Sequence, residues 1–215
     1  MRLVLYSGGV DSTTALFWSM QTQETHALLF VYPSRHNAQE LAHAHAICEA
    51  HRIAHHTMDA SALFAGFASG LLAPNTTSSA IPHGQYDANA LSRLVVPFRN
   101  GIFLSIACGL AQSLGASEVV LANHAGDHPI YPDCSRAFID SMGAAIASGT
   151  DGAVRLLSPF CALDKAAIVR LGIELNIDYT QTYSCYEGGA KHCNQCPTCL
   201  ESIEAFAQNG LTIER

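Results

Sequence analysis

The sequence predicts an α/β fold, a doubly wound parallel sheet with helices on both faces, followed by a small cysteine-rich tail. Short apolar runs suited to buried strands alternate with longer runs of helical periodicity along most of the chain. Hydrophobic residues make up 49% of the 215 residues and charged residues only 13%, which provides a full core for one large domain. We therefore expect a main domain over 1–180 and a C-terminal subdomain over 181–215.

The first strand is expected at 2–6, where Arg-Leu-Val-Leu-Tyr forms a short apolar run of the kind buried in a parallel sheet. A helical period starts directly afterwards and predicts a helix over 12–21. The same alternation predicts, in order, a strand at 27–32, a helix at 37–51, a strand at 53–58 and a short helix at 61–67.

A segment rich in Pro, Asn, Thr, Ser and Gly breaks this pattern over 70–92 and predicts a long excursion of the kind that serves as a lid or binding element. The alternation then resumes, with a helix at 99–114, a strand at 118–122, a loop through 134, a helix at 135–148, a strand at 153–157 and a helix at 164–171. Parallel order places ligands at the carboxyl ends of the strands.

Composition excludes several classes of protein. The net charge is −7 and only 11 residues are Lys or Arg, so extended contact with nucleic acid is not expected. No apolar run reaches the roughly 18 residues that cross a bilayer, and no membrane partner is expected. The first residues lack the pattern of a secretory signal, which makes the cytoplasm the expected location.

The turn after the first strand, Ser-Gly-Gly-Val-Asp-Ser at 7–12, is the strongest functional signal. It joins a strand to a helix N-terminus, where free backbone N–H groups favour an anion and glycines allow close approach. Neither the Walker pattern nor the dinucleotide fingerprint fits it. The turn resembles the pyrophosphate loop of ATP pyrophosphatases; the alternative is an ordinary Gly-rich turn with Asp11 as a cap. The expected nucleotide-binding residues are Tyr6, Ser7, Gly8, Gly9, Val10, Asp11, Ser12 and Thr13.

Four cysteines lie within fifteen residues near the C-terminus, and they are Cys185, Cys193, Cys196 and Cys199. This spacing is suited to a closed tetrahedral thiolate shell around zinc (Zn²⁺), which would fold the tail rather than catalyse. An iron–sulfur cluster also uses thiolates, and His192 is an alternative ligand. Of the remaining cysteines, Cys48, Cys108 and Cys161 are expected to be small hydrophobic residues, whereas the role of Cys134 stays open.

Five further segments, together with the loop and the cysteines, resemble the 7-cyano-7-deazaguanine synthase family almost from end to end. They are Tyr-Pro-Ser-Arg-His at 32–36, Val-Pro-Phe-Arg-Asn-Gly-Ile-Phe-Leu-Ser at 96–105, Tyr-Pro-Asp-Cys at 131–134, Ser-Pro-Phe-Cys-Ala-Leu-Asp-Lys at 158–165 and Ser-Cys-Tyr-Glu-Gly at 184–188. The resemblance implies a ligase that uses ATP and ammonia to convert 7-carboxy-7-deazaguanine to the nitrile, through an acyl-adenylate and an amide. It also implies ATP and magnesium (Mg²⁺) as cofactors and a homodimer.

The matched segments suggest roles for individual residues. Catalysis is expected from Lys165, Arg99, Asp133 and Asp11, with cations neutralising phosphate charge and Asp11 orienting the loop or holding magnesium. Substrate binding is expected from Arg35, His36, Arg99, Asn100, Asp127, Tyr131 and Asp133. A loop carboxylate can accept from an exocyclic amine and Tyr131 can stack on a ring. The alternatives are an exposed Lys, a surface Arg and solvated carboxylates.

Two positions depart from the family pattern. Pro33 and Ser34 replace Gly-Gln, and Glu201 stands where the family has Arg two residues after the last cysteine. A divergent member could stop at the amide or transfer the acyl group to another amine, such as one on a protein. A tRNA-modifying enzyme with a pyrophosphate loop and a non-catalytic nucleotide-binding zinc module are further alternatives.

Overall fold

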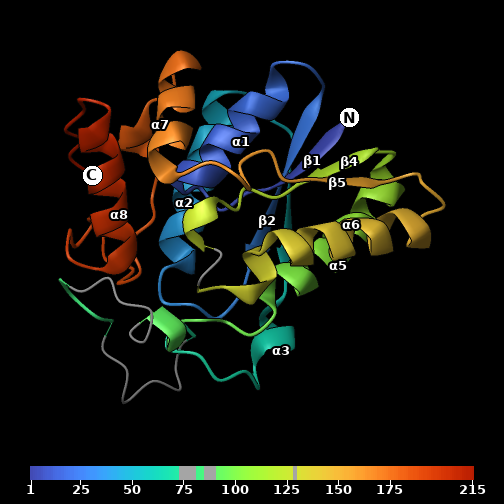
Figure 1. The fold of residues 1–215 in the computed structure, drawn as a ribbon, viewed down its shortest axis with the longest axis horizontal. Helices are drawn as coiled ribbons and strands as arrows, with labels where there is room; N and C mark the ends of the chain where they lie inside the picture. Colours follow the sequence, from blue (N-terminus) through green and yellow to red (C-terminus); the bar gives the residue numbers. More distant parts are fainter. Residues whose placement is uncertain (73–80, 85–90, 128–129) are drawn as a thin grey trace.

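The structure, a computed structural model, describes residues 1–72, 81–84, 91–127 and 130–215 (Figure 1). Within these residues the strands form one sheet, in the order β3-β2-β1-β4-β5, and every pairing is parallel. The strands are β1 (Arg2–Leu5), β2 (Thr25–Val31), β3 (His55–Asp59), β4 (Glu118–Val120) and β5 (Arg155–Leu157). The predicted doubly wound parallel sheet is therefore confirmed.

Helices follow the strands along the chain. They are α1 (Val10–Met20), α2 (Asn37–Ala50), α3 (Ser61–Phe64), α5 (Arg99–Leu114), α6 (Arg136–Gly149), α7 (Lys165–Glu174) and α8 (Pro197–Gln208). Three short 3-10 turns add η1 (Ala125–Asp127), η2 (Pro132–Cys134) and η3 (Tyr179–Gln181). None of the helices in the described ranges is long and apolar enough to cross a membrane.

The sheet is buried on both faces, because successive side chains of each strand point to opposite sides. In β1, Leu3 and Leu5 join a core shared with α3, α5 and α6, whereas Val4 packs with α1, α2 and α7 on the other face. Figure 1 shows α5 and α6 lying apart from α1 and α7. Strand order reverses between β1 and β4, which opens a crevice at the carboxyl ends of these two strands.

The predicted boundaries are close to those observed. The helix over 99–114 is confirmed at both ends, while the second strand begins two residues earlier than predicted and the fourth ends two residues earlier. The short helix expected over 61–67 is only one turn, Ser61–Phe64. Helix α8 was not predicted. It begins at Pro197, within the cysteine pattern, and its residues were assigned only to the tail.

The excursion predicted over 70–92 is described only in part, since 73–80 and 85–90 lie outside the described residues. Leu72 forms an isolated bridge with Ser34, and the backbone N–H of Gly84 donates to the carbonyl of Gln195 at 2.9 Å. His83 and Glu187 lie 2.8 Å apart, between ring Nε2 and Oε1. The described parts of this segment therefore contact the loop that precedes α2 and the C-terminal tail.

The tail packs against the main domain. Helix α8 contacts α7, and Tyr183 with three of the tail cysteines belongs to the same buried cluster as β1 and α5. The backbone N–H of Tyr183 also donates to the carbonyl of Gly8, in the loop after β1, at 2.9 Å. A division of the chain after residue 180 stays a prediction.

Candidate active site

A cavity of about 250 Å³ opens at the carboxyl ends of β1 and β4. Its lining comes from the loop after β1, from α2 and α5, from the loop after β4, and from the start of α7 and α8. This is the switch point of the sheet, the place where open α/β sheets bind ligands. The location matches the sequence-based expectation.

The loop after β1 has the conformation of an anion site. Gly8 has φ +82°, and a Cβ there would lie 2.8 Å from the carbonyl oxygen of Glu40, so glycine is required. Gly9 is the N-cap of α1 and no side chain caps the helix, so the first-turn N–H groups are left for a ligand. The hydroxyl oxygens of Ser7 and Ser12 lie 3.1 Å apart beside this turn.

Six of the eight predicted nucleotide-binding residues line the cavity, and these are Tyr6, Ser7, Gly9, Val10, Asp11 and Ser12. Thr13 is buried, and its hydroxyl donates to the Tyr6 hydroxyl at 3.4 Å. Gly8 packs against α2 through the close approach to Glu40. Gly8 and Thr13 therefore lie outside the cavity lining and support the conformation of the loop.

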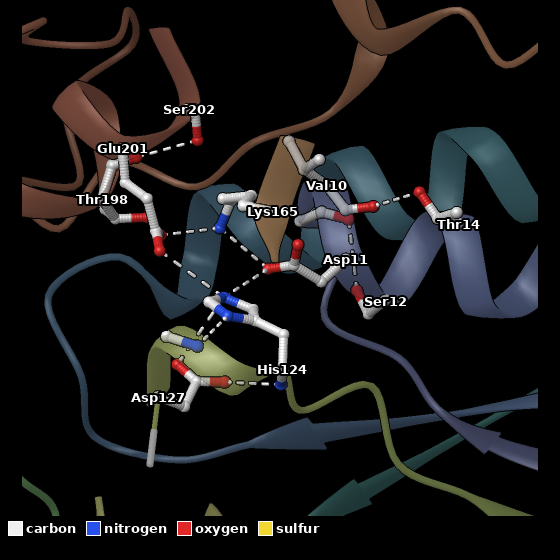
Figure 2. Close-up of polar contacts among 12 residues, drawn as sticks. Val10, Asp11, Ser12, Thr14, His124, Asp127, Lys165, Thr198, Glu201 and Ser202 are labelled. Carbon is white, nitrogen blue, oxygen red and sulfur yellow. Dashed lines mark hydrogen bonds and ion pairs between the residues drawn. The ribbon is translucent and has the colours of Figure 1, made fainter. Parts of the chain in front are cut away.

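Lys165, at the start of α7, is held by two carboxylates (Figure 2). Its Nζ donates to Oδ2 of Asp11 and to Oε2 of Glu201, each at 2.9 Å. Burial lowers the pKa of Lys165, but the charges of Asp11 and Glu201 outweigh it and leave the pKa above its usual value. The group is a permanent cation 8% exposed at the phosphate loop.

His124, just after β4, faces three carboxylates, as Figure 2 shows. Its Nε2 lies 3.6 Å from Glu201, 3.7 Å from Asp127 and 3.9 Å from Asp11. The backbone N–H of Gly126 donates to Nδ1 at 3.1 Å, so the ring proton is on Nε2 and points toward the carboxylates. The cluster holds more acidic than basic groups, which is an environment that attracts a cation.

The pKa values of two of these carboxyl groups are shifted in opposite directions. Burial raises the pKa of Asp11, but the Lys165 ammonium and the neighbouring His124 ring more than offset this and hold the pKa below its ordinary value. Burial dominates at Asp127 and raises its pKa. Oδ1 of Asp11 is buried and has no hydrogen-bond partner among the described residues. An ionised carboxylate with a free buried oxygen is suited to a metal ligand.

The other end of the cavity contains Arg99 and an aromatic group. Nη1 of Arg99 donates to the Tyr32 hydroxyl at 3.2 Å, and the hydroxyl groups of Tyr131 and Tyr186 lie 3.4 Å apart. His36 also lines this end, whereas Arg35 does not line the cavity. The predicted substrate residues Arg99, His36 and Tyr131 are therefore together, with Arg35 displaced from them.

Asp133 and Asn100 are bound to each other. Oδ2 of Asp133 accepts from the backbone N–H of Asn100 at 2.8 Å, at the N-terminus of α5, where Phe98 provides no side-chain cap. Asn100 Nδ2 donates to the sulfur of Cys134 at 3.1 Å. Burial raises the pKa of the Cys134 thiol, so it is a protonated thiol at neutral pH and not a nucleophile.

The four predicted metal-ligand cysteines come together, with their sulfur atoms within 4.8 Å of one another. Backbone N–H groups donate to two of them: the N–H of Cys193 to Cys185 at 3.3 Å, and the N–H of Cys196 to Cys193 at 3.2 Å. Such donors stabilise thiolates, and four close thiolates fit a tetrahedral structural ion. His192 lies outside this set and accepts from the backbone N–H of Ser184 at 3.1 Å.

Sequence reasoning missed several lining residues and noted one, Glu201, only as a departure. His124, Glu40 and Tyr186 were not selected, and Glu201 was seen only where the family has Arg. His124 lies four residues after the end of β4, a position that favours a ligand role, but it is one of 11 histidines in the sequence. Glu40 lies four residues after His36 and shares its helix face.

The chain is similar to known proteins over nearly its whole length. The family model described as "Queuosine biosynthesis protein QueC" matches residues 1–210. The chain is 42% identical over 209 residues to a 7-cyano-7-deazaguanine synthase of Porphyromonas gingivalis, covering 97% of this chain and 93% of that protein. It is 40% identical over 210 residues to the synthase of Caldicellulosiruptor saccharolyticus, covering 97% and 92%.

A solved structure of NMN synthetase from Francisella tularensis shares the fold, with a TM-score of 0.55 and 15% sequence identity. The match covers 99% of this chain and 78% of that one. At this identity the likeness concerns the fold alone. The family match over nearly the whole chain and the two relatives at 40% identity or more establish that the chain belongs to the QueC family.

Proposed function

We propose that this chain is a 7-cyano-7-deazaguanine synthase, which converts 7-carboxy-7-deazaguanine and ammonia to the nitrile at the expense of ATP. The family and the names of its relatives support this activity. The observation that carries it is the pairing of Lys165 with the phosphate loop at one end of a cavity whose other end holds Arg99. These names do not favour a product released as the amide or transferred to a protein.

The first half of the reaction makes a leaving group of the carboxylate oxygen. The substrate carboxylate attacks the α-phosphorus of ATP, pyrophosphate departs and an acyl-adenylate forms. Ammonia then displaces AMP and loses a proton, which gives the amide. In the second half the amide oxygen attacks the α-phosphorus of a second ATP and pyrophosphate departs; the oxygen then leaves with AMP, and loss of two protons gives the nitrile.

Charge neutralisation is the main contribution of the protein to these steps. Free N–H groups of α1 and the Lys165 ammonium would bind the triphosphate. Arg99 would bind the substrate carboxylate, and His36, Asn100, Tyr131 and Asp133 would contact the ring. The roles of Arg35 and Asp127 in substrate binding stay predictions.

Two metal ions complete the proposal. Asp11 and Asp127 are suited to Mg²⁺, because Asp11 has a free buried oxygen and both face the phosphate loop. When bound, magnesium would neutralise phosphate charge. The four tail cysteines are suited to Zn²⁺, which would fix the tail beside α7. We also propose a homodimer in the cytoplasm, which light scattering and fractionation of cells test.

Labelled nucleotide tests the proposed function directly. ATP labelled at the α-phosphate is incubated with the protein, the carboxylic acid and ammonia, and products are identified by chromatography and mass spectrometry. We expect labelled AMP, pyrophosphate and the nitrile, with no AMP when the acid is left out. Release of only ADP and orthophosphate would contradict attack at the α-phosphorus, and a product that ends at the amide would contradict the second half.

A further inference from the structure

Glu40 places a carboxyl group in the wall of the cavity. It lies in the first turn of α2, beside the phosphate loop, and its side chain is 13% exposed. The Nε2 atom of His36 lies 3.7 Å from its Oε2. No hydrogen bond to the carboxyl group is seen within the described part of the chain, and the group lines the cavity, so its two oxygens are available to a ligand.

The neighbours of Glu40 do not neutralise it by contact. Burial and the charge of Arg99 lower the pKa of His36 to about 3, so this ring is neutral at physiological pH. The ring is 3% exposed and its Nδ1 has no partner among the described residues. Arg99 donates instead to the Tyr32 hydroxyl. The neutral His36 ring and the Glu40 carboxyl group therefore lie side by side on one wall of the cavity.

We propose that Glu40 determines specificity for the purine-like ring by accepting hydrogen bonds from two adjacent donors, the ring N1–H and the 2-amino group. This inference rests on the proposed function and names the substrate edge that the site reads. The two oxygens of one carboxylate match two donors in a plane. An adenine-type ring has an acceptor at N1 and no 2-amino group, so it leaves both oxygens of Glu40 without a donor, whereas a hypoxanthine-type ring keeps N1–H and leaves one oxygen without a donor.

The remaining walls suit a flat ring. Phe30 and Phe103 stack with centroids 4.0 Å apart and both line the cavity, as do Leu71 and Leu94. An apolar wall excludes water, which strengthens each hydrogen bond to the ring and raises the cost of an unpaired one. A ring that lacks a donor to Glu40 should therefore lose much of its binding free energy in this environment.

Ionisation of Glu40 would be linked to binding. Burial raises its pKa to about 8, so the free group is mostly protonated at pH 7. The titratable groups that face it are His36, Arg99, Tyr32 and Tyr183. Two donors from the ring favour the ionised form, so binding releases a proton and becomes tighter as pH rises toward 8.

The test compares the wild-type chain with Glu40→Gln and with a matched control, Glu49→Gln, which removes an exposed carboxylate from the same helix. AMP release is measured with the 7-carboxy-7-deazaguanine acid and with its 2-deamino analogue. The wild type should lose about 10- to 100-fold in kcat/KM on the analogue. Glu40→Gln should raise the KM for the acid by a similar factor, leave the KM for ATP unchanged and discriminate little between the two acids.

Several outcomes would overturn the inference. Wild-type protein that uses both acids equally excludes a role for the 2-amino group, whatever the variants do. A Glu40→Gln variant with a wild-type KM for the acid, or one that keeps full discrimination, excludes Glu40 as the acceptor. If the wild type released no AMP with the acid, the proposed function would fail and this inference with it; AMP release without discrimination removes the inference alone.

Discussion

The ammonium group of Lys165 lies 2.9 Å from Oδ2 of Asp11, although the two residues are 154 positions apart in the sequence. The contact joins the start of α7 to the phosphate loop after β1. Glu201, from the tail helix α8, binds the same ammonium at 2.9 Å. The cation that would meet the triphosphate is therefore positioned by both the main domain and the tail.

Lys165→Ala should abolish pyrophosphate release, because no other cation contacts the phosphate loop at this point among the described residues. Removal of one buried electrostatic donor from an active site typically costs about 10²- to 10³-fold in rate. The variant should also unfold at a lower temperature, since Asp11 and Glu201 would lose their shared partner. A coupled pyrophosphate assay and thermal unfolding measure the two effects.

Arg170→Ala is the control for this prediction, because it removes an exposed cation from the same helix. It should leave both the rate and the unfolding temperature close to those of the wild type. A Lys165→Ala variant that released pyrophosphate at the wild-type rate would remove Lys165 from the mechanism.

Glu201→Gln should lower the KM for ATP. The Glu201 carboxylate binds Lys165 and faces the nucleotide end of the cavity, so it competes with phosphate for the cation and repels it. Relief of roughly 1 kcal/mol of repulsion corresponds to about a fivefold lower KM. Glu204→Gln, which alters an exposed residue of α8, should leave the KM unchanged. An unchanged or higher KM in Glu201→Gln would show that the carboxylate does not oppose ATP.

The order of strands and helices could be predicted because the apolar runs are short and the phosphate loop lies between the first strand and the first helix. The helix over 99–114 was predicted at both ends, since Gly115 ends it in a left-handed conformation, φ +72°. The cysteine tetrad was predicted from spacing alone. Helix α8 was not predicted, because its first turn carries Cys199 of the cysteine pattern and was interpreted only as part of the metal site.

The contacts between distant segments could not be predicted from the sequence. The cap that Asp133 provides for α5, by accepting from the N–H of Asn100, joins residues 33 positions apart, while its expected role toward a ligand stays a prediction. His124 lies near Asp11, and Glu201 binds Lys165, only because β4 lies next to β1 and α8 packs beside α7. Such convergence depends on strand order and on packing, which no local pattern encodes.

The four tail cysteines should bind one equivalent of zinc per chain. Cys196→Ser replaces a buried thiolate in the tetrad, so it should lose the metal and lower the unfolding temperature. A strong chelator should have the same effect on the wild type. Cys108→Ser, outside the tetrad, should keep its metal. Elemental analysis measures the metal content of each variant. A metal-free wild type that unfolds at an unchanged temperature would contradict a structural ion.

The pH dependence of stability should identify Glu40 as a buried carboxyl group. Its pKa is raised from 4.5 to about 8 by burial, so the folded state holds a proton that the unfolded chain releases. Its contribution to stability is complete below pH 4.5 and is lost as pH rises through 8, by up to about 1.4 kcal/mol per pH unit. In the absence of substrate, Glu40→Gln should therefore become progressively more stable than the wild type between pH 6 and about 8. Denaturant unfolding measures the difference. Parallel curves for the wild type, Glu40→Gln and the exposed control Glu49→Gln would show that Glu40 ionises normally.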